Sequence, residues 1–377
     1  MKVKEVIEII EKWAPPGVAW DRDNVGLQIG NTENPVSRVL LSLDVTENVV
    51  NYATENNFNL IISHHPLFFF PVKKIQFNSD TKSKIIKKLI ENNISVFSAH
   101  TNLDFTKEGV SYQLAKKLGL SKIQFLHNIA DKQYKLVVFV PSEFKDKVAN
   151  AIFEAGGGII GEYEKCSFEI KGTGTFQGSE KSNPVIGTKQ NFEKVEEIRL
   201  EVLVDNWKLN GVIKALISSH PYEEPAYDIY VLKNSNVNYG EGAIGELNAP
   251  MKIKDFLELV ASKLKIPAIR YAKGKSARIK KVAVCGGTCS SLVNEAISQN
   301  ADAFVTADIK YHEFQDAEGK ILFIDAGHYE TENTVLPEVK RKLNEYAKSR
   351  KEKLTVKIYR QSTNPVNYYI KYKGEMK

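Results

Sequence analysis

The sequence has little cysteine and no long apolar run. Its 377 residues include only three cysteines, Cys166, Cys285 and Cys289, too few for the disulfide framework of a small secreted domain. Its apolar runs are interrupted by Lys, Asn or Glu within about 10 residues, well short of the roughly 20 needed to span a bilayer. The chain begins with an amphipathic helical pattern and not with an apolar secretory core. We therefore expect a cytoplasmic protein without a membrane segment.

Neither sign of charge is in large excess. The chain has 52 Lys and Arg against 46 Asp and Glu, a formal net charge of +6. Nucleic acid could bind a basic cluster at 278–281 or a basic segment at 340–357. Glu is interspersed with Lys in the second segment and no aromatic platform accompanies it. We interpret both as solvated surfaces and do not favour nucleic-acid binding.

Apolar residues make up 42% of the chain, enough for two or three cores. Residues 37–120 alternate strand and helix patterns and 239–377 repeat the style, which is typical of parallel sheets covered by helices. The expected strands are 38–45, 59–63, 94–99, 281–285, 303–306, 321–325 and 354–359, and the expected helices are 48–57, 81–92, 110–118, 253–264, 291–299 and 334–348. We predict an α/β fold with a two-lobed core and parallel-rich sheets, in which 239–377 forms the second lobe.

The order of elements changes between the two lobes. The patterns are β, α, β, β, α, β, the plan of a ferredoxin-like domain, at 134–141, 144–155, 165–172, 198–204, 209–218 and 226–232. Polar stretches flank this region, as expected where a domain is inserted into a surface loop. We predict a discontinuous core at 1–128 and 237–377, interrupted by an inserted ferredoxin-like domain at 129–236.

Histidines follow the apolar runs. His64 and His65 come directly after Leu60–Ser63, and His100 follows the next run with Asp104 four residues later. Ligands bind at the carboxyl ends of strands in open α/β sheets, so these side chains can meet at one edge. Adjacent imidazoles point in different directions and can serve two neighbouring ions. Adjacent histidines also occur in ordinary solvated loops, but the run before this pair is too apolar for one.

A third run, 321–327, ends in Gly327, which permits a tight turn. The first turn of the next helix would keep Glu332 ionised. A set of three imidazoles and two carboxylates suits two ions such as Zn, Mn, Fe or Co better than Ca. Two ions about 3.5 to 4 Å apart would share a bridging water and lower its pKa, which favours hydrolysis. The candidate ligands are His64, His65, Asp104, His328 and Glu332.

Three other histidine positions have competing explanations. His100 is our catalytic candidate, since it could orient a ligand, contact substrate or pass a proton. His312 either lines the same cavity or is structural. His220 lies in a segment rich in Pro, Tyr and Glu, which is more typical of a packed turn than of a small-ligand or subunit interface.

A glycine-rich turn at 285–291 joins an expected strand to an expected helix. Backbone N–H groups in that setting can cradle phosphate, but the lysine of a P-loop is missing. Cys285 and Cys289 could bind a metal, yet no second pair accompanies them. We expect both to be buried by packing.

Several motifs in the same order resemble the Nif-three-like family of dinuclear metal-centre proteins, whose members are often labelled GTP cyclohydrolase type 2 homologues. The inserted region is similar to nitrogen-regulatory PII and copper-tolerance proteins, and its segments 172–176 and 220–227 match the long members of the family. One departure is Asp23, which adds a second acid to the loop after Trp20. The core motifs are Trp20-Asp21 with 24–30, 63–66, 99–104, Thr306-Ala307-Asp308 with Tyr311-His312, and Gly327-His328 with Glu332.

The resemblance implies that the five candidate residues ligate metal, with Glu332 as a bridge, and that the chain forms a toroidal homohexamer whose sites face an internal cavity. Our first hypothesis is a dinuclear metal-dependent hydrolase that acts on a small nucleotide-like or phosphate-containing substrate, with a bridging water as nucleophile and His100 assisting proton transfer. Ring-opening of GTP rests on the family label alone, because no residue pattern indicates guanine recognition. The alternative is a ring-shaped metal-binding or regulatory protein whose insert senses a small ligand without catalysis.

Overall fold

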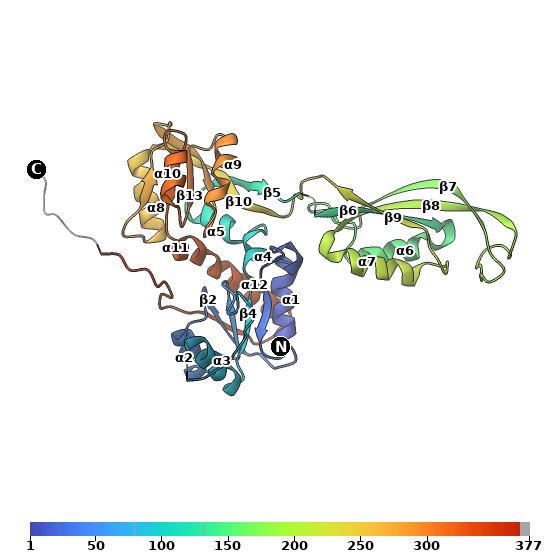
Figure 1. The fold of residues 1–377 in the computed structure, drawn as a ribbon, viewed down its shortest axis with the longest axis horizontal. Coiled ribbons are helices and arrows are strands. Elements are labelled where there is room, and N and C mark those ends of the chain that lie inside the picture. Colours follow the sequence, from blue (N-terminus) through green and yellow to red (C-terminus); the bar gives the residue numbers. More distant parts are fainter. Residues whose placement is uncertain (79, 131, 370–377) are drawn as a thin grey trace, which may run out of the picture. The chain divides into compact units, whose positions relative to one another are not determined.

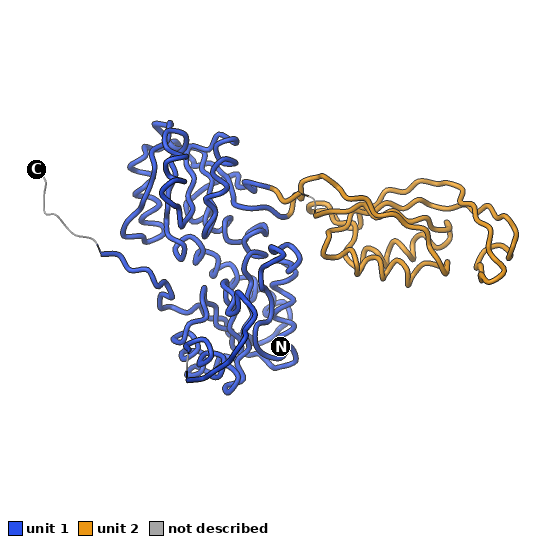
Figure 2. The backbone as a smooth tube through the Cα atoms, viewed as in Figure 1, with its two compact units in different colours: residues 1–127, 239–377 blue, residues 128–238 orange. Residues whose placement is uncertain are grey.

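The chain divides into two compact units in a computed structural model that describes residues 1–78, 80–130 and 132–369. Unit 1 consists of Met1–His127 and Tyr239–Lys377, and unit 2 consists of Asn128–Asn238 (Figure 2). Within the described residues, none of the helices combines the length and apolar character needed to cross a membrane. Each unit is described below by itself.

The first sheet of unit 1 has the strand order β1-β4-β3-β2-β15. All four residues of β3 and of β4 are buried, which explains their continuous apolar runs. Helices α1 and α12 share one core with some residues of this sheet. Helices α2 and α3 share a second core with other residues of the same sheet (Figure 1). The bounds are β1 Gly26–Ile29, β2 Arg38–Ser42, β3 Leu60–Ser63, β4 Ser95–Ser98, β15 Thr355–Ile358, α1 Val3–Trp13, α2 Glu47–Glu55, α3 Thr81–Glu91 and α12 Leu336–Ser349.

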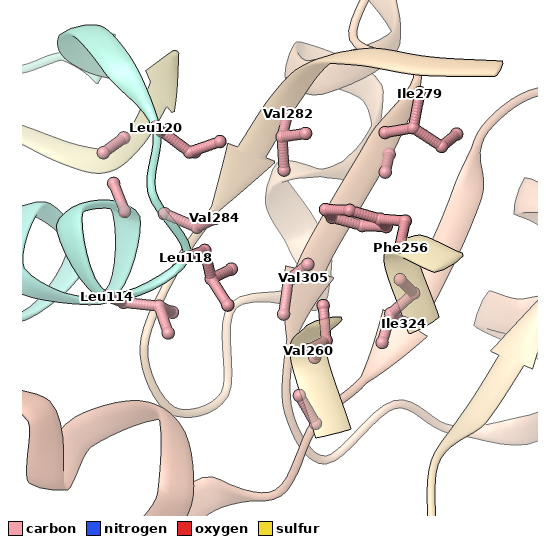
Figure 3. Packing of buried hydrophobic residues seen from close by; sticks show 14 of the residues in the cluster. Leu114, Leu118, Leu120, Phe256, Val260, Ile279, Val282, Val284, Val305 and Ile324 are labelled. Carbon is pink, nitrogen blue, oxygen red and sulfur yellow. The ribbon is translucent and has the colours of Figure 1, made fainter. Parts of the chain in front are cut away.

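The second sheet of unit 1 has the order β11-β14-β13-β12-β10-β5, with β12, β13 and β14 parallel. Leu114, Phe256 and Val305 belong to one core cluster that packs against it (Figure 3). Two helices, α9 and α10, contribute side chains to a separate core cluster. The bounds are β5 Ser121–Asn128, β10 Gly240–Lys252, β11 Arg270–Ala272, β12 Arg278–Val284, β13 Ala303–Thr306, β14 Leu322–Asp325, α5 Val110–Lys117, α8 Ile253–Leu264, α9 Val293–Ser298 and α10 Tyr311–Ala317.

The last helix and the last strand of the chain, α12 and β15, are part of the lobe that contains the first sheet. Our assignment of all of 239–377 to the second lobe is therefore wrong. Strand β15 pairs parallel with β2, and Leu343 of α12 is buried in the same core as Ile10 of α1. Conversely, α5 was expected in the first lobe, but its Leu114 is part of the core of the second sheet. The apolar spacing of these elements predicts that they are amphipathic but not which of two apolar sheets they cover.

Unit 2 is a four-stranded antiparallel sheet in the order β7-β8-β6-β9. Alternate residues of β6 and β8 pack with α6 and α7 in one core, represented by Val138, Leu200 and Ile152. The elements are β6 Gln133–Pro141, α6 Lys145–Glu154, β7 Ser167–Gln177, β8 Phe192–Asp205, α7 Asn206–Ser219 and β9 Tyr227–Leu232. The predicted α/β class with parallel-rich sheets is confirmed for the chain, with the parallel strands in unit 1.

Candidate metal centre

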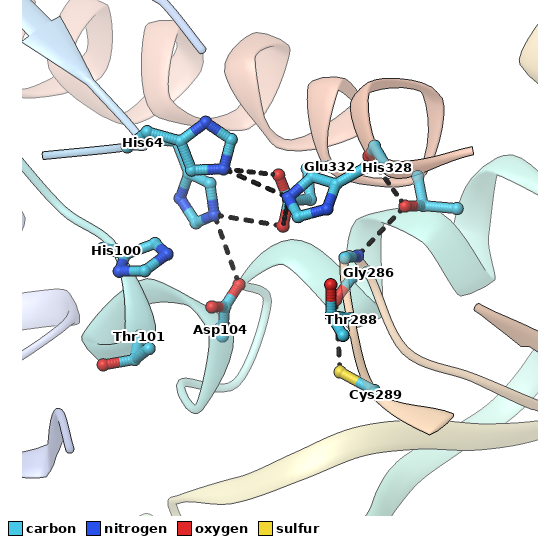
Figure 4. A network of polar contacts seen from close by, with 12 residues as sticks. His64, His100, Thr101, Asp104, Gly286, Thr288, Cys289, His328 and Glu332 are labelled. Carbon is cyan, nitrogen blue, oxygen red and sulfur yellow. Dashed lines mark hydrogen bonds and ion pairs between the residues drawn. The ribbon is translucent and has the colours of Figure 1, made fainter. Parts of the chain in front are cut away.

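The candidate centre lies within unit 1, where residues that follow strands of both sheets come together (Figure 4). His64 and His65 follow β3, and His100 follows β4 at the start of the short helix α4, Thr101–Asp104. His328 and Glu332 are the first and last residues of α11, which follows β14. Gly327 has φ of 78° immediately before α11, so the chain turns there through a conformation that favours glycine.

The structure brings all five predicted ligands together, with the carboxylate of Glu332 among three imidazoles. Its Oε1 lies 3.1 Å from His328 Nε2 and 3.8 Å from His64 Nε2. Its Oε2 lies 2.9 Å from His65 Nε2. On the other side, Asp104 Oδ1 is 3.5 Å from His64 Nε2. The nitrogen and oxygen donors thus face one shared space.

The imidazoles of His64 and His65 are each held in position by a hydrogen bond at Nδ1. Nδ1 of His64 lies 2.8 Å from the carbonyl oxygen of Ala99, which only accepts, so the proton is on Nδ1 and the lone pair on Nε2. Nδ1 of His65 lies 2.7 Å from Asp44, whose second oxygen accepts from Thr363 at 2.5 Å. Partners of this kind fix the tautomer and orientation that a metal-binding histidine needs.

The same arrangement holds at the other two histidines. Nδ1 of His328 lies 2.6 Å from Asp308, and Nδ1 of His100 lies 3.0 Å from both oxygens of Asp23. Asp23 also accepts hydrogen bonds from the backbone and hydroxyl of Thr101. The acid that departs from the expected loop pattern therefore positions the catalytic candidate. In all four histidines, Nδ1 has a protein partner.

The two carboxyl groups of the centre differ in pKa. Burial would raise the pKa of Glu332, but the surrounding imidazoles of His64, His328 and His65 hold it well below the usual range. Burial raises the pKa of Asp104 well above its usual range, and the charge of Glu332 adds to this effect. One acid is therefore ionised among the imidazoles and the other favours a proton unless a cation is near.

The histidines differ in pKa as well. Burial lowers the pKa of His64. Burial acts in the same direction on His65, but the hydrogen bond to Asp44 and the nearby Glu332 carboxylate outweigh it and raise its pKa to about 9. Burial is likewise outweighed at His328, where the hydrogen bond to Asp308 and the Glu332 carboxylate raise the pKa to about 10. These two imidazoles are thus cationic at neutral pH and offset the charge of the nearby carboxylates.

The donor set fits divalent cations. His64 Nε2, Asp104 Oδ1 and Glu332 Oε2 are buried and make no hydrogen bond to any other described residue. Leaving such atoms unsatisfied is costly, and an ion with imidazole and carboxylate ligands would satisfy all three. The donor atoms form two groups within 4.8 Å, His64 with His65 and His100, and His65 with His328 and Glu332. His100 is predicted to lie outside the ligand set, yet a nitrogen of its ring belongs to the first of these groups.

The glycine-rich turn after β12 packs against the centre, and two of its backbone N–H groups have partners within the chain. The backbone N–H of Gly286 faces the hydroxyl of Ser111 at 3.4 Å, and that of Gly287 donates to Thr331 at 3.0 Å. A Cβ at Gly287, whose φ is 70°, would overlap the Glu332 carboxylate. The turn therefore makes room for Glu332.

Three further residues of this region were considered from the sequence. Cys285 and Cys289 pack in one core cluster as expected, Cys285 buried and Cys289 partly buried, and they are joined as a disulfide, which was not predicted. His312 is exposed on α10, where its Nδ1 meets Gln315 at 3.0 Å. It is absent from the groups of metal-binding donors formed by the described residues.

The sequence did not lead us to Asp44 and Asp308 as partners of the histidine Nδ1 atoms. Asp44 comes two residues after β2, so the strand-end rule that selected His64 would also have selected it. Asp308 follows β13 in the same way, and we noted it only as part of a family motif. Thr363 is far from every motif, and the sequence has no signal that would place it beside Asp44.

Comparison with known proteins identifies the family that the sequence motifs indicate, and the matches cover nearly the whole chain. A family model described as Duf34/NIF3 (NGG1p interacting factor 3) matches residues 1–365. A Halalkalibacterium halodurans protein named "GTP cyclohydrolase 1 type 2 homolog" is 40% identical over 367 residues, 96% of this chain and 98% of the relative. A Bacillus subtilis protein of the same name is 36% identical over 97% of this chain and 98% of the relative.

A solved structure from Bacillus cereus, titled as a protein related to NIF3, superimposes with a TM-score of 0.82 at 37% identity. The match covers 98% of this chain and 99% of that one. The resemblance inferred from the motifs is thereby confirmed. The chain belongs to the Duf34/NIF3 family.

Proposed function

We propose that unit 1 binds two divalent metal ions and hydrolyses a small nucleotide-like or phosphate-containing substrate. The observation that supports this most directly is the Glu332 carboxylate, which is buried among the Nε2 atoms of His64, His65 and His328. A carboxylate in this place would help to hold both ions. Zn, Mn, Fe and Co all suit the donors.

The assignment of the five ligands follows from which donors face each other. His64 faces Asp104 and Oε1 of Glu332, so these residues would hold one ion. His65 and His328 approach Glu332 together, with 3.3 Å between their Nε2 atoms, so these would hold the other. The protonated Nδ1 of each imidazole leaves Nε2 as the ligand atom.

When bound, a pair of divalent ions lowers the pKa of a water between them and neutralises negative charge that develops on substrate oxygens. The chain's own contribution to proton transfer falls to His100. Its ring lies 5.2 Å from that of His64 and 5.6 Å from that of His65, and Asp23 fixes its Nδ1. The carboxylate would stabilise the imidazolium that forms when Nε2 accepts a proton.

The substrate class is proposed from the donors and from the relatives. A bimetallic site with open positions suits phosphate oxygens, and the Bacillus subtilis relative is named as a GTP cyclohydrolase homologue. We also propose that the chain acts as a toroidal homohexamer, as the family resemblance implies, which sedimentation of the full chain can test.

The test combines metal content with turnover. Wild-type protein purified without added metal should contain about two ions per chain by elemental analysis and should hydrolyse at least one member of a panel of nucleotides and phosphoesters. Glu332→Gln should lose both. The control is Glu330→Gln on the same helix, because Glu330 instead accepts from Asn364 at 2.9 Å. Metal-free wild type, or background turnover with Mn, Zn and Fe alike, would contradict the proposal.

The second candidate is a ring-shaped metal-binding or regulatory protein in which the insert senses a small ligand without catalysis. The cleft in unit 2 described below favours it. Ligand binding without turnover in metal-loaded protein would select this candidate over the first.

A further inference from the structure

Unit 2 contains a cleft of about 520 Å³ that is separate from the metal centre. It is bounded by the second half of β7, by the chain that joins β7 to β8, and by the turn before β9. The cleft thus brings together the two insert segments singled out in the sequence, 172–176 and 220–227. Neither segment has a part in the proposed hydrolysis.

The walls of the cleft are largely apolar. Phe139 and Phe176 line it together with two aliphatic side chains, Ile170 and Val185, which are 46% and 58% exposed. A volume of this size with apolar walls and few polar groups is typical of small-molecule sites. A flat apolar ligand that covers these exposed side chains would remove apolar surface from water, which favours binding.

One polar group in the cleft is unusual, the carboxylate of Glu197. The residue is only 9% exposed, and its Oε1 accepts a hydrogen bond from the hydroxyl of Tyr222 at 3.0 Å. A side chain at residue 174 would overlap this carboxylate, so Gly174 is required for its position. A Cβ at Gly172, which pairs with Glu197 across the strands, would meet open space. The carboxylate therefore borders open volume.

The cations of the cleft are already paired, whereas Glu197 is not. Nζ of Lys171 lies 3.6 Å from Glu196, and Nε of Arg199 donates to Glu201 at 3.0 Å. Among the residues that the structure describes, no Lys, Arg or His forms an ion pair with Glu197. A carboxylate that lines the cleft and has no ion-pair partner among the described residues can pair with a positively charged ligand.

The turn that carries Tyr222 is rigidly attached to the sheet. His220 donates from Nε2 to the carbonyl of Phe139 at 3.0 Å, and its Nδ1 accepts from the backbone N–H of Tyr222 at 3.1 Å. The predicted structural role of His220 agrees with these bonds. The hydroxyl that holds Glu197 is thus fixed before any ligand arrives, which reduces the entropic cost of binding.

We propose that this cleft is a binding site for a small planar aromatic ligand with two adjacent N–H donors, such as an aryl amidinium or a protonated amino-heterocycle. The ring would lie against the apolar walls and the N–H pair would meet the Glu197 carboxylate. Paired charge-assisted hydrogen bonds of this kind are strong and directional. Anionic ligands are disfavoured, because Glu223 and Glu224 also line the cleft.

The experiment uses the full chain and benzamidine as the probe, with binding measured by calorimetry. Benzamide has the same shape without the charge, and benzoate has the opposite charge. Benzamidine should bind with at least tenfold higher affinity than benzamide, and benzoate should not bind. Glu197→Gln should reduce benzamidine affinity at least tenfold. The matched control is Glu196→Gln, because residue 196 directly precedes Glu197, lies on the opposite face of β8 and is exposed.

Glu332→Gln tests whether benzamidine binds at the metal centre instead of in the cleft. We expect this variant to bind benzamidine with the affinity of the wild type. Equal binding of benzamide and benzamidine, or no binding of benzamidine at 10 mM (about 3 kcal/mol) to wild type, would overturn the proposal without any variant. Unchanged binding by Glu197→Gln would overturn it equally. None of these outcomes depends on turnover, so failure of this proposal and failure of the proposed hydrolase are distinguishable.

Discussion

Metal binding to unit 1 should release protons, because two of the proposed ligands are charged in the metal-free chain. The pKa of His65 is raised to about 9 and that of His328 to about 10. At pH 7.5 both are protonated, and a histidine must be neutral to coordinate a metal. We expect at least two protons per chain, one from each imidazole. The raised pKa of Asp104 can only add to this number.

The affinity for metal should therefore rise with pH. Each displaced proton contributes about tenfold per pH unit below the pKa of its group, so two protons give up to about 100-fold per unit between pH 7 and 9. The rise should end above the pKa of about 10 of His328. The proton number follows from calorimetric titration with Mn in buffers that differ in ionisation enthalpy. No proton release together with pH-independent affinity would refute the reasoning, since the two imidazoles would then be neutral or would not be ligands.

The stability of the metal-free chain should change in the opposite direction. The ion pairs of the two charged imidazoles with Asp44, Asp308 and Glu332 contribute fully below the unfolded histidine pKa of about 6.5. That contribution is lost as the pH rises through about 9 and then about 10. Thermal melts of chelator-treated protein between pH 6 and 10 should show a falling midpoint, and the metal-loaded protein should not follow it.

Four substitutions, one of them with a matched control, give further predictions. Asp44→Asn should weaken metal binding about 10- to 100-fold by removing the partner of a histidine ligand, measured by competition with a chelator; unchanged affinity would contradict the assigned ligand. Gly287→Ala should lose metal, whereas Gly319→Ala, with a similar φ of 73° but no atom within 4 Å of its Cβ, should cost only about 1 kcal/mol of backbone strain in urea unfolding and keep its metal. His100→Gln should keep the metal content but reduce turnover about 10²- to 10⁴-fold; equal turnover would remove it from the mechanism. Leu343→Ala should destabilise the chain by about 2–5 kcal/mol in urea unfolding, since this leucine is fully buried; a loss below 1 kcal/mol would mean that α12 is not part of the first core.

Sequence patterns were sufficient for the parts of the centre that lie at strand ends. His64 and His328 stood out because the runs before them are continuous apolar strands, buried along their whole length. The role of Gly287 could not be predicted in the same way, since it depends on a carboxylate 45 residues later that reaches the turn only after the helix α11 packs. Contacts of this kind are set by tertiary geometry, for which the local pattern has no signal.

The same limit applies to the fold. The strands and helices that were predicted overlap observed ones because their periodicities are local. Strands β1, β5, β10 and β11 were not predicted. Strand β1 is short, only partly buried and without alternation. The return of α12 and β15 to the first sheet depends on partners more than 300 residues away, as in the pairing of Thr355 with Arg38. Amphipathic spacing indicates that a helix needs a partner, but it leaves the choice of partner open.

That return also sets the order in which the protein can fold during synthesis. Histidines 64 and 65 leave the ribosome early, but the sheet that holds them lacks its last strand until residue 358 has been made. At about 5 to 20 residues per second, the ribosome needs roughly 15 to 50 seconds to travel from β4 to β15, and it makes the whole of unit 2 in that interval. The first lobe must therefore wait, with part of its apolar surface uncovered, for the end of its own chain. A nascent protein of this design has more need of chaperone protection at its N-terminal third than its final compact form suggests.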